Sequence, residues 1–142
     1  MTRIELRDLR DDDRDAAYAA LRASASTWPR GEVADRAAFD AWVDADRVTA
    51  RAIVDEDTVV GLAATLDVDG DREALLAVSP ETSRESATEA LRLLTLAEPE
   101  RPLYACVAAD DDPSHDTLAR LGFVEHGRDG ADIVYVLPPT LE

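Results

Sequence analysis

Residues 101–123 read RPLYACVAADDDPSHDTLARLGF, and this stretch decides the fold. Its first part, from Leu103 to Ala109, is a nearly continuous apolar run, which is typical of a central strand covered on both faces. An acidic loop follows, and Asp112 before a proline predicts the N-cap of a short helix. Gly122 suits the left-handed residue that ends such a helix, and Phe123 begins the next apolar run. The stretch therefore predicts a strand, a helix and a second strand in succession.

The remaining sequence adds an antiparallel meander and further helices. Asp69-Gly70 is a strong hairpin signal between expected strands at 58–68 and 72–78. Over 83–97, apolar residues recur at helical spacing. Further elements are expected as strands at 3–9, 48–54, 123–126 and 133–137 and as helices at 11–23 and 33–46. The order β-α-α-β-β-β-α-β-α-β-β predicts an α/β (α+β) domain over 1–142 with a mixed sheet.

Composition excludes several classes of function. The chain has 142 residues, 15 of them basic (all Arg) against 31 acidic, for a net charge of −16. Electrostatic capture of nucleic acid or of an anionic membrane needs the opposite sign, so neither partner is expected. We find no apolar run near 20 residues, and the N-terminal residues resemble a strand rather than a signal peptide. With Cys106 as the only cysteine no intrachain disulfide can form, which favours a reducing cytoplasm.

The acidic excess also favours a halophilic, acidic proteome. Self-repulsion at −16 is costly at low salt, whereas at molar salt the Debye length falls to about 3 Å. A GC-rich genome would explain the missing Lys and Asn but not the surplus of Asp.

The order of elements, together with residues 101–110, Ser114 and 118–123, resembles the GNAT superfamily of N-acetyltransferases. Val59-Val60-Gly61 and Trp42 also fit the family's pattern, and the branch that looks most similar includes ribosomal-protein and small-amine acetyltransferases. The resemblance implies a mixed, mainly antiparallel central sheet of about seven strands flanked by about four helices. It also implies acetyl-CoA as co-substrate, in a V-shaped opening between the fourth and fifth strands, and no metal.

The resemblance places a pyrophosphate cradle at the start of the 83–97 helix. The family pattern there is Arg or Gln, two residues, Gly, one residue, and Gly or Ala, and it fits this chain in two registers, neither with a glycine. Thr82 to Glu85 also reads as a capping box, which favours a purely structural helix start with fewer free N–H groups. The residues expected to bind the coenzyme are Val78, Ser83, Arg84, Ser86, Ala87, Thr88 and, at the family's Asn position, Asp111.

The resemblance implies two catalytic residues. Glu73, early in the 72–78 strand, is the expected general base; the alternative is a solvent-facing strand residue. The family's usual Tyr acid is replaced by Leu118, so Ser114 is the expected acid, with first-turn capping as its alternative. The two histidines are isolated in the sequence, Cys106 is expected to pack in a buried strand, and residues 110–112 suit a solvated loop better than a cation site.

The most favoured function is transfer of an acetyl group from acetyl-CoA to a primary amine, either a small molecule or a protein N-terminus. The alternatives are a non-catalytic GNAT-fold binding or regulatory module with a decayed acetyl-CoA site, and a dimerisation or scaffolding domain that uses its sheet edges. The acceptor is not indicated by the sequence, although the loop at 24–32 offers Trp28 as a bulky recognition residue. The sequence does not decide the oligomeric state, and a homodimer is one of the states that it allows.

Overall fold

The computed structural model describes residues 3–23 and 35–139. The strands are β1 (Ile4–Asp8), β2 (Val48–Asp55), β3 (Thr58–Val68), β4 (Asp71–Val78), β5 (Leu103–Ala108), β6 (Val124–Asp129) and β7 (Asp132–Leu137). They form one seven-stranded sheet in the order β1-β2-β3-β4-β5-β7-β6. All neighbours are antiparallel except β4 and β5, so the predicted mixed, mainly antiparallel sheet is confirmed.

The helical elements among the described residues are the 3-10 turn η1 (Asp11–Asp13) and the helices α1 (Arg14–Ala23), α2 (Arg36–Asp44), α3 (Arg84–Ala97) and α4 (Asp112–Arg120). The predicted order of strands and helices and the four flanking helices are confirmed. Within the described part of the chain no helix has the length and apolar character needed to cross a membrane. The loop at 24–32 with Trp28, and the expected start of α2 at residue 33, lie outside the described residues.

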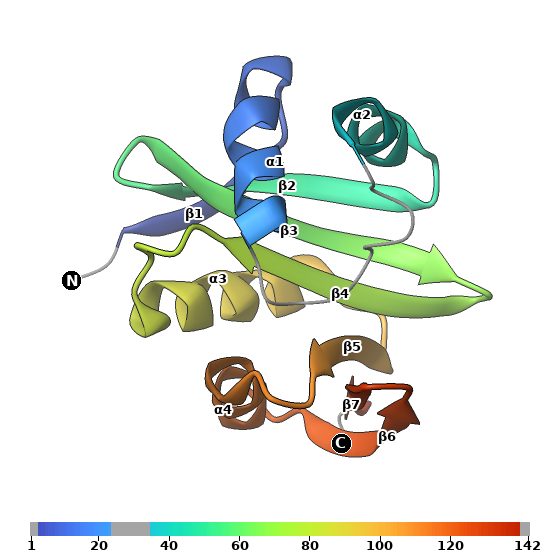
Figure 1. The fold of residues 1–142 in the computed structure, drawn as a ribbon. Coiled ribbons are helices and arrows are strands. Elements are labelled where there is room, and N and C mark those ends of the chain that lie inside the picture. The colour runs from blue at the N-terminus through green and yellow to red at the C-terminus, as the bar shows by residue number, and fades with distance from the viewer. Residues whose placement is uncertain (1–2, 24–34, 140–142) are drawn as a thin grey trace.

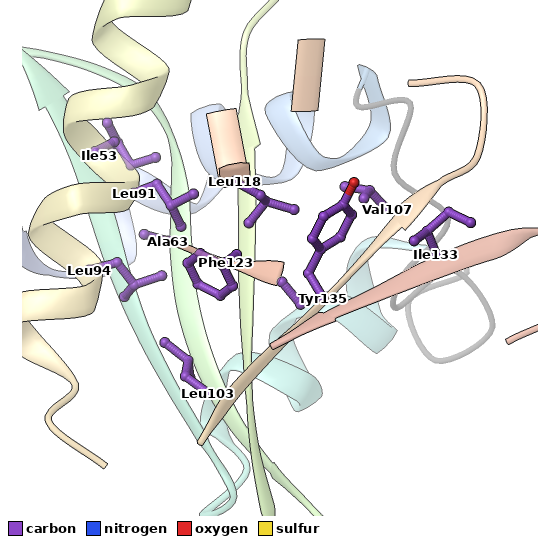
Figure 2. Close-up of a cluster of buried hydrophobic side chains, with 12 residues drawn as sticks. Ile53, Ala63, Leu91, Leu94, Leu103, Val107, Leu118, Phe123, Ile133 and Tyr135 are labelled. Carbon is purple, nitrogen blue, oxygen red and sulfur yellow. The ribbon is translucent and has the colours of Figure 1, made fainter. Parts of the chain in front are cut away.

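Helices lie on both faces of the sheet (Figure 1), and an apolar core fills the space on each side. Helices α1 and α2 cover one face, where Phe39 and Trp42 pack with Leu62, Leu66 and Leu75. Helices α3 and α4 cover the other face, and Figure 2 shows this cluster. Its buried members are Ile53, Ala63, Ala90, Leu91, Leu94, Leu103, Ala105, Val107, Leu118, Phe123, Ile133 and Tyr135. Successive side chains of β4 and β5 point alternately toward these two cores, so the position of each residue along its strand determines the face on which its side chain lies.

Two local signals of the sequence act as expected. Asp69 and Gly70 have φ of 53° and 89°, the pair of positive values that a tight hairpin turn requires. Gly122 has φ of 93° after α4, and the Phe123 N–H bonds the Leu118 carbonyl at 3.1 Å while the Gly122 N–H bonds Ala119 at 3.2 Å. These two bonds form a Schellman motif, which sends the chain from α4 into β6.

Gly61 allows β3 and β4 to approach closely. It lies beside a bulge, because Val54 of β2 faces Val59 while Ile53 faces Gly61. A Cβ on Gly61 would lie 2.1 Å from the carbonyl oxygen of Ala77 on β4. Only glycine fits here without moving the strand.

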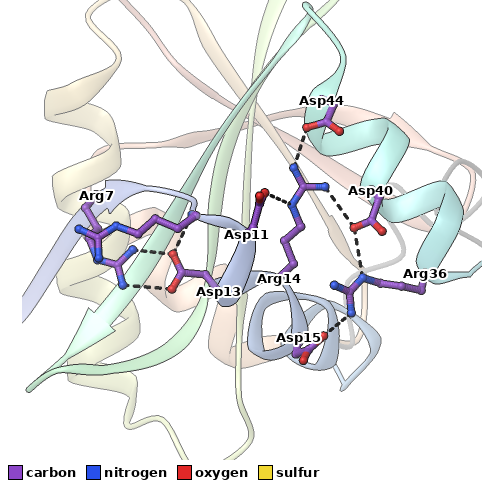
Figure 3. Close-up of polar contacts among 9 residues, drawn as sticks. Arg7, Asp11, Asp13, Arg14, Asp15, Arg36, Asp40 and Asp44 are labelled. Carbon is purple, nitrogen blue, oxygen red and sulfur yellow. Dashed lines mark hydrogen bonds and ion pairs between the residues drawn. The ribbon is translucent and has the colours of Figure 1, made fainter.

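Ion pairs between Arg and Asp join α1 to α2 (Figure 3). Arg14 reaches Asp40 at 3.2 Å and Asp44 at 2.7 Å, and Arg36 bridges Asp40, at 3.1 Å, and Asp15. The hydrogen bond from Arg36 is the main cause that lowers the pKa of the Asp40 carboxyl. The Arg14 side chain is only 15% exposed, whereas its Asp partners and Arg36 are exposed, so salt weakens these pairs.

Candidate active site

The central strands β4 and β5 pair only at their beginnings. Their parallel register ends at Ala74 with Ala105, although both strands continue. Beyond that point β4 stays paired with β3 as far as Val78, and β5 stays paired with β7 as far as Ala108. The two strands therefore follow their outer neighbours, and the sheet opens between them.

A cavity of about 340 Å³ lies at this opening. Its apolar lining comes from both strands and the surrounding helices and consists of Ala23, Ala74, Leu75, Leu76, Val78, Pro80, Ala87, Leu91, Ala105, Val107, Pro113 and Leu118. The polar or reactive lining residues are Glu73, Ser79, Thr82, Ser83, Arg84, Cys106, Asp111, Ser114 and Thr117. A mainly apolar channel with a few polar groups is typical of a site for an organic ligand.

Glu73 and Cys106 reach the cavity from the α1/α2 face of the sheet. Leu75 packs in the α1/α2 core, and Glu73, two residues earlier on β4, shares its face. Ala105 and Val107 pack in the α3/α4 core, so Cys106 between them lies on the opposite face. The Cys106 Sγ lies 3.8 Å from the Glu73 Oε1. The prediction that Cys106 packs inside a buried strand is wrong, because the opening leaves it half-buried on the cavity wall.

The start of α3 differs from the predicted capping box. Ser83, not Thr82, is the N-cap, and its Oγ accepts the Ser86 N–H at 3.1 Å. Thr82 belongs to the preceding turn, where its N–H bonds the Ser79 carbonyl at 3.0 Å and its hydroxyl lies 2.9 Å from that of Ser79. The helix therefore begins one residue later, and Glu85 stands at its second position, where it does not close a capping box.

Two backbone donors remain at the start of α3. The N–H groups of Arg84 and Glu85 lie in the first turn, where an α-helix provides no acceptor, and within 35–139 no other hydrogen bond uses them. The Arg84 guanidinium, about half exposed, lies 3.6 Å from Asp116 of α4, which also pairs with Arg120 at 3.0 Å. Free amides, the positive end of the helix dipole and a guanidinium together form a site suited to an anion.

Ser114 and Asp111 form one hydrogen-bonded unit at the start of α4. Asp111, rather than the predicted Asp112, is the N-cap, and its Oδ1 accepts the Ser114 N–H at 3.4 Å. The Ser114 Oγ donates to the Asp111 Oδ2 at 2.6 Å. Both residues line the cavity.

His115 links α4 to the neighbouring strands β5 and β7. Its Nδ1 lies 2.6 Å from the Tyr135 hydroxyl, and its Nε2 lies 3.0 Å from the Ala108 carbonyl. Since a carbonyl can only accept, Nε2 donates to it. Burial raises the pKa of the Tyr135 hydroxyl. The side chain of His115, isolated in the sequence, thus ties α4 to β5 and β7.

Several solved structures share this architecture. A GNAT-family acetyltransferase from Bacillus cereus matches with a TM-score of 0.72 at 15% identity, over 98% of this chain and 99% of that one. The Campylobacter jejuni N-acetyltransferase PseH, solved in complex with acetyl coenzyme A, matches with a TM-score of 0.68 at 10% identity, over 97% and 100%. The Vibrio cholerae spermidine N-acetyltransferase, in complex with CoA and spermine, matches with a TM-score of 0.67 at 14% identity, over 94% and 92%.

This chain has the GNAT fold. No protein-family model and no curated protein matches its sequence. The similarity to GNAT acetyltransferases therefore lies in the architecture. The ribosomal-protein and small-amine branch stays a prediction.

Most of the predicted site residues meet at the opening of this GNAT sheet. The cavity lining includes Glu73, Val78, Ser83, Arg84, Ala87, Asp111 and Ser114. Ser86 and Thr88 do not line it. The Ser86 hydroxyl is buried against Ser83, and the Thr88 hydroxyl donates to the Arg84 carbonyl at 2.9 Å. The Ser83 hydroxyl donates a hydrogen bond to the Ser86 hydroxyl. The hydroxyls of Ser83, Ser86 and Thr88 therefore all form hydrogen bonds within α3 or at its cap, and none of them is placed to donate to a phosphate. Ser83 does line the cavity, as predicted.

Other lining residues were not identified from the sequence. Ser79 and Thr82 lie in the loop that leads to α3, and Cys106 lies on β5. The positions of Ser79 and Thr82 between β4 and α3 could have indicated that they line the cavity, because this loop passes its mouth. No local pattern indicated that Cys106 lines the cavity, because its exposure depends on the point at which β4 and β5 part. The described residues hold no cluster of three or more His, Cys, Asp or Glu side chains placed to bind a metal ion.

Proposed function

We propose that the protein is an N-acetyltransferase that moves an acetyl group from acetyl-CoA to a primary amine. The observation that carries the proposal is the cavity between β4 and β5. The start of α3, with its free N–H groups, lies near this cavity, and Glu73 lines it from the α1/α2 face of the sheet. The mainly apolar walls suit a narrow pantetheine arm, and the α3 start suits the pyrophosphate. Acetyl-CoA supplies the thioester whose acetyl group is transferred.

The roles of the protein groups follow from their positions. Arg84 and the N–H groups of Arg84 and Glu85 would bind the phosphates, and Val78 and Ala87 would contact the arm beyond them. Glu73 lies on the opposite face of the sheet, where an amine would approach through the gap. Its carboxylate would accept the proton that the amine nitrogen loses as the C–N bond forms and the C–S bond breaks.

Two observations favour a cationic amine as the acceptor. The Vibrio enzyme of the same fold is a spermidine N-acetyltransferase solved with spermine, so polyamines are the first amines to test. A net charge of −16 also favours a cationic acceptor, although salt screens that attraction. A peptide N-terminus and a homodimer remain predictions of the sequence.

A thiol-release assay in concentrated KCl tests the proposal, with acetyl-CoA and a panel that contains spermine, a monoamine and a short peptide. We expect turnover with at least one amine, and we expect Glu73→Gln to reduce kcat by about 10²- to 10⁴-fold, because a general base contributes that much. Glu56→Gln is the matched control, since Glu56 is exposed in the turn between β2 and β3 and does not line the cavity. Equal rates for both variants would exclude Glu73 as the base.

A non-catalytic GNAT-fold module is the second candidate. It is favoured by the glycine-free start of α3 and by Asp116, whose carboxylate, 3.6 Å from the Arg84 guanidinium, would compete with a phosphate for it. Binding of CoA without turnover on any amine of the panel would support this candidate, and turnover would exclude it.

A further inference from the structure

The hydrogen bond between Ser114 and Asp111 has only one possible direction. A serine hydroxyl has one proton and two lone pairs, whereas a carboxylate has acceptors only. The 2.6 Å separation of Ser114 Oγ and Asp111 Oδ2 falls in the range of charge-assisted O–H···O⁻ bonds. The Ser114 hydroxyl therefore donates its proton to the hydrogen bond with Asp111, and toward the cavity it can act only as an acceptor.

This polarity does not suit a proton donor. A sulfur that leaves as a thiolate needs a donor, and an oxygen that presents lone pairs would repel it. The pantetheine arm of acetyl-CoA, in contrast, carries amide N–H groups that need acceptors. The Asp111 carboxylate cannot resupply a proton to Ser114, because it carries none: Oδ2 accepts the Ser114 hydroxyl, and Oδ1 accepts the Ser114 N–H, which also bonds the Asp111 carbonyl at 3.1 Å.

We propose that Asp111 is a positioning residue that holds Ser114 as a hydrogen-bond acceptor for an amide N–H of the pantetheine arm. Ser114 then binds the coenzyme instead of acting as the acid that the sequence resemblance implied. The inference rests on the proposed function. As the C–N bond forms and the C–S bond breaks, the electron pair departs on sulfur and the nitrogen proton goes to Glu73. Sulfur takes a proton from water, and the proton that Glu73 then releases neutralises the hydroxide.

Asp111→Asn tests the inference because it reverses this polarity. The asparagine Oδ1 can still cap the Ser114 N–H, so the start of α4 is kept. Its Nδ2 then faces the Ser114 Oγ as a donor, and the serine proton is free to turn toward the cavity. Asp112→Asn is the matched control, since it removes the same charge one residue away, where the side chain is exposed and does not line the cavity.

The measurement is calorimetric titration of each variant with CoA in concentrated KCl, together with kcat and KM. We expect Asp111→Asn and Ser114→Ala each to raise the Kd for CoA about three- to tenfold, the range for one hydrogen bond, and Asp112→Asn to match the parent. The double variant should bind no more weakly than Ser114→Ala alone, because both changes remove one contact. The loss should appear in KM for acetyl-CoA rather than in kcat.

Two results would overturn the inference while leaving the proposed function intact. One is a Ser114→Ala variant that binds CoA like the parent and loses kcat, which would restore Ser114 as the acid. The other is an Asp111→Asn variant with parental Kd or a raised kcat. Ser114→Ala keeps the Asp111 cap of the Ser114 N–H, so it is informative even if the Asp111 variant fails to fold. A parent chain that does not bind CoA would refute the proposed function and this inference together.

Discussion

Replacement of Gly61 by alanine perturbs the strand that forms one wall of the cavity. The added Cβ would lie 2.1 Å from the Ala77 carbonyl oxygen and 3.0 Å from the Val78 Cα. The first distance is roughly 1 Å shorter than any distance tolerated, and both neighbours are backbone, so β4 itself must shift, at a cost of about 1–3 kcal/mol. In a domain of this size that cost lowers the melting temperature by about 3–10 °C. Val78 lines the cavity, so the shift also changes its mouth.

Gly127→Ala is the control for this experiment. A Cβ there meets nothing within 4 Å, so alanine should be neutral or slightly stabilising through the lower entropy of the unfolded chain. Thermal melts of both variants beside the parent, monitored by circular dichroism in concentrated KCl, give the comparison. Equal melting temperatures for the two variants would refute the claim that Gly61 is required by the close approach of β3 and β4.

Three further outcomes are expected. Arg84→Glu should abolish the stabilisation by acetyl-CoA, whereas Arg128→Glu on exposed β6 should keep it, as thermal shifts will show. Asp13→Asn should cost about 1–3 kcal/mol in urea unfolding at pH 7, because Asp13 is buried and bonded to Arg7 at 2.5 Å. That bond lowers the pKa of Asp13, so its contribution is present above the unfolded pKa of about 3.9 and is lost as the pH falls further; a parent advantage undiminished at pH 3 would contradict this. Leu94→Ala should cost about 2–5 kcal/mol in the same urea assay, since Leu94 is fully buried under the sheet.

The fold was predictable wherever the signal was local. Asp69-Gly70 and Gly122 specify backbone angles through their own chemistry, so the hairpin and the end of α4 were found at the right residues. Helix starts were displaced by one residue at both α3 and α4, because neighbouring side chains can each cap a helix and the preceding turn decides between them. At α3 that turn is made by Ser79 and Thr82.

The site was predictable only in part. The parting of β4 and β5 depends on which outer strand each follows, so no local pattern encodes it, and it was expected only through the GNAT resemblance. Ser86 and Thr88 were chosen by counting along a motif, whereas the lining follows the helix period through Ser83, Ala87 and Leu91. The direction of the Ser114 hydroxyl required coordinates, because the sequence does not tell which acidic neighbour accepts its proton.

The account depends most on coenzyme binding at the opening between β4 and β5. Unfolding of the parent chain in concentrated KCl, with and without acetyl-CoA at about 100 times its Kd, measures this directly. We expect about 2.7 kcal/mol of added stability. An unfolding free energy that stays the same up to millimolar acetyl-CoA would contradict the claim that this cavity and the free N–H groups of α3 hold the coenzyme.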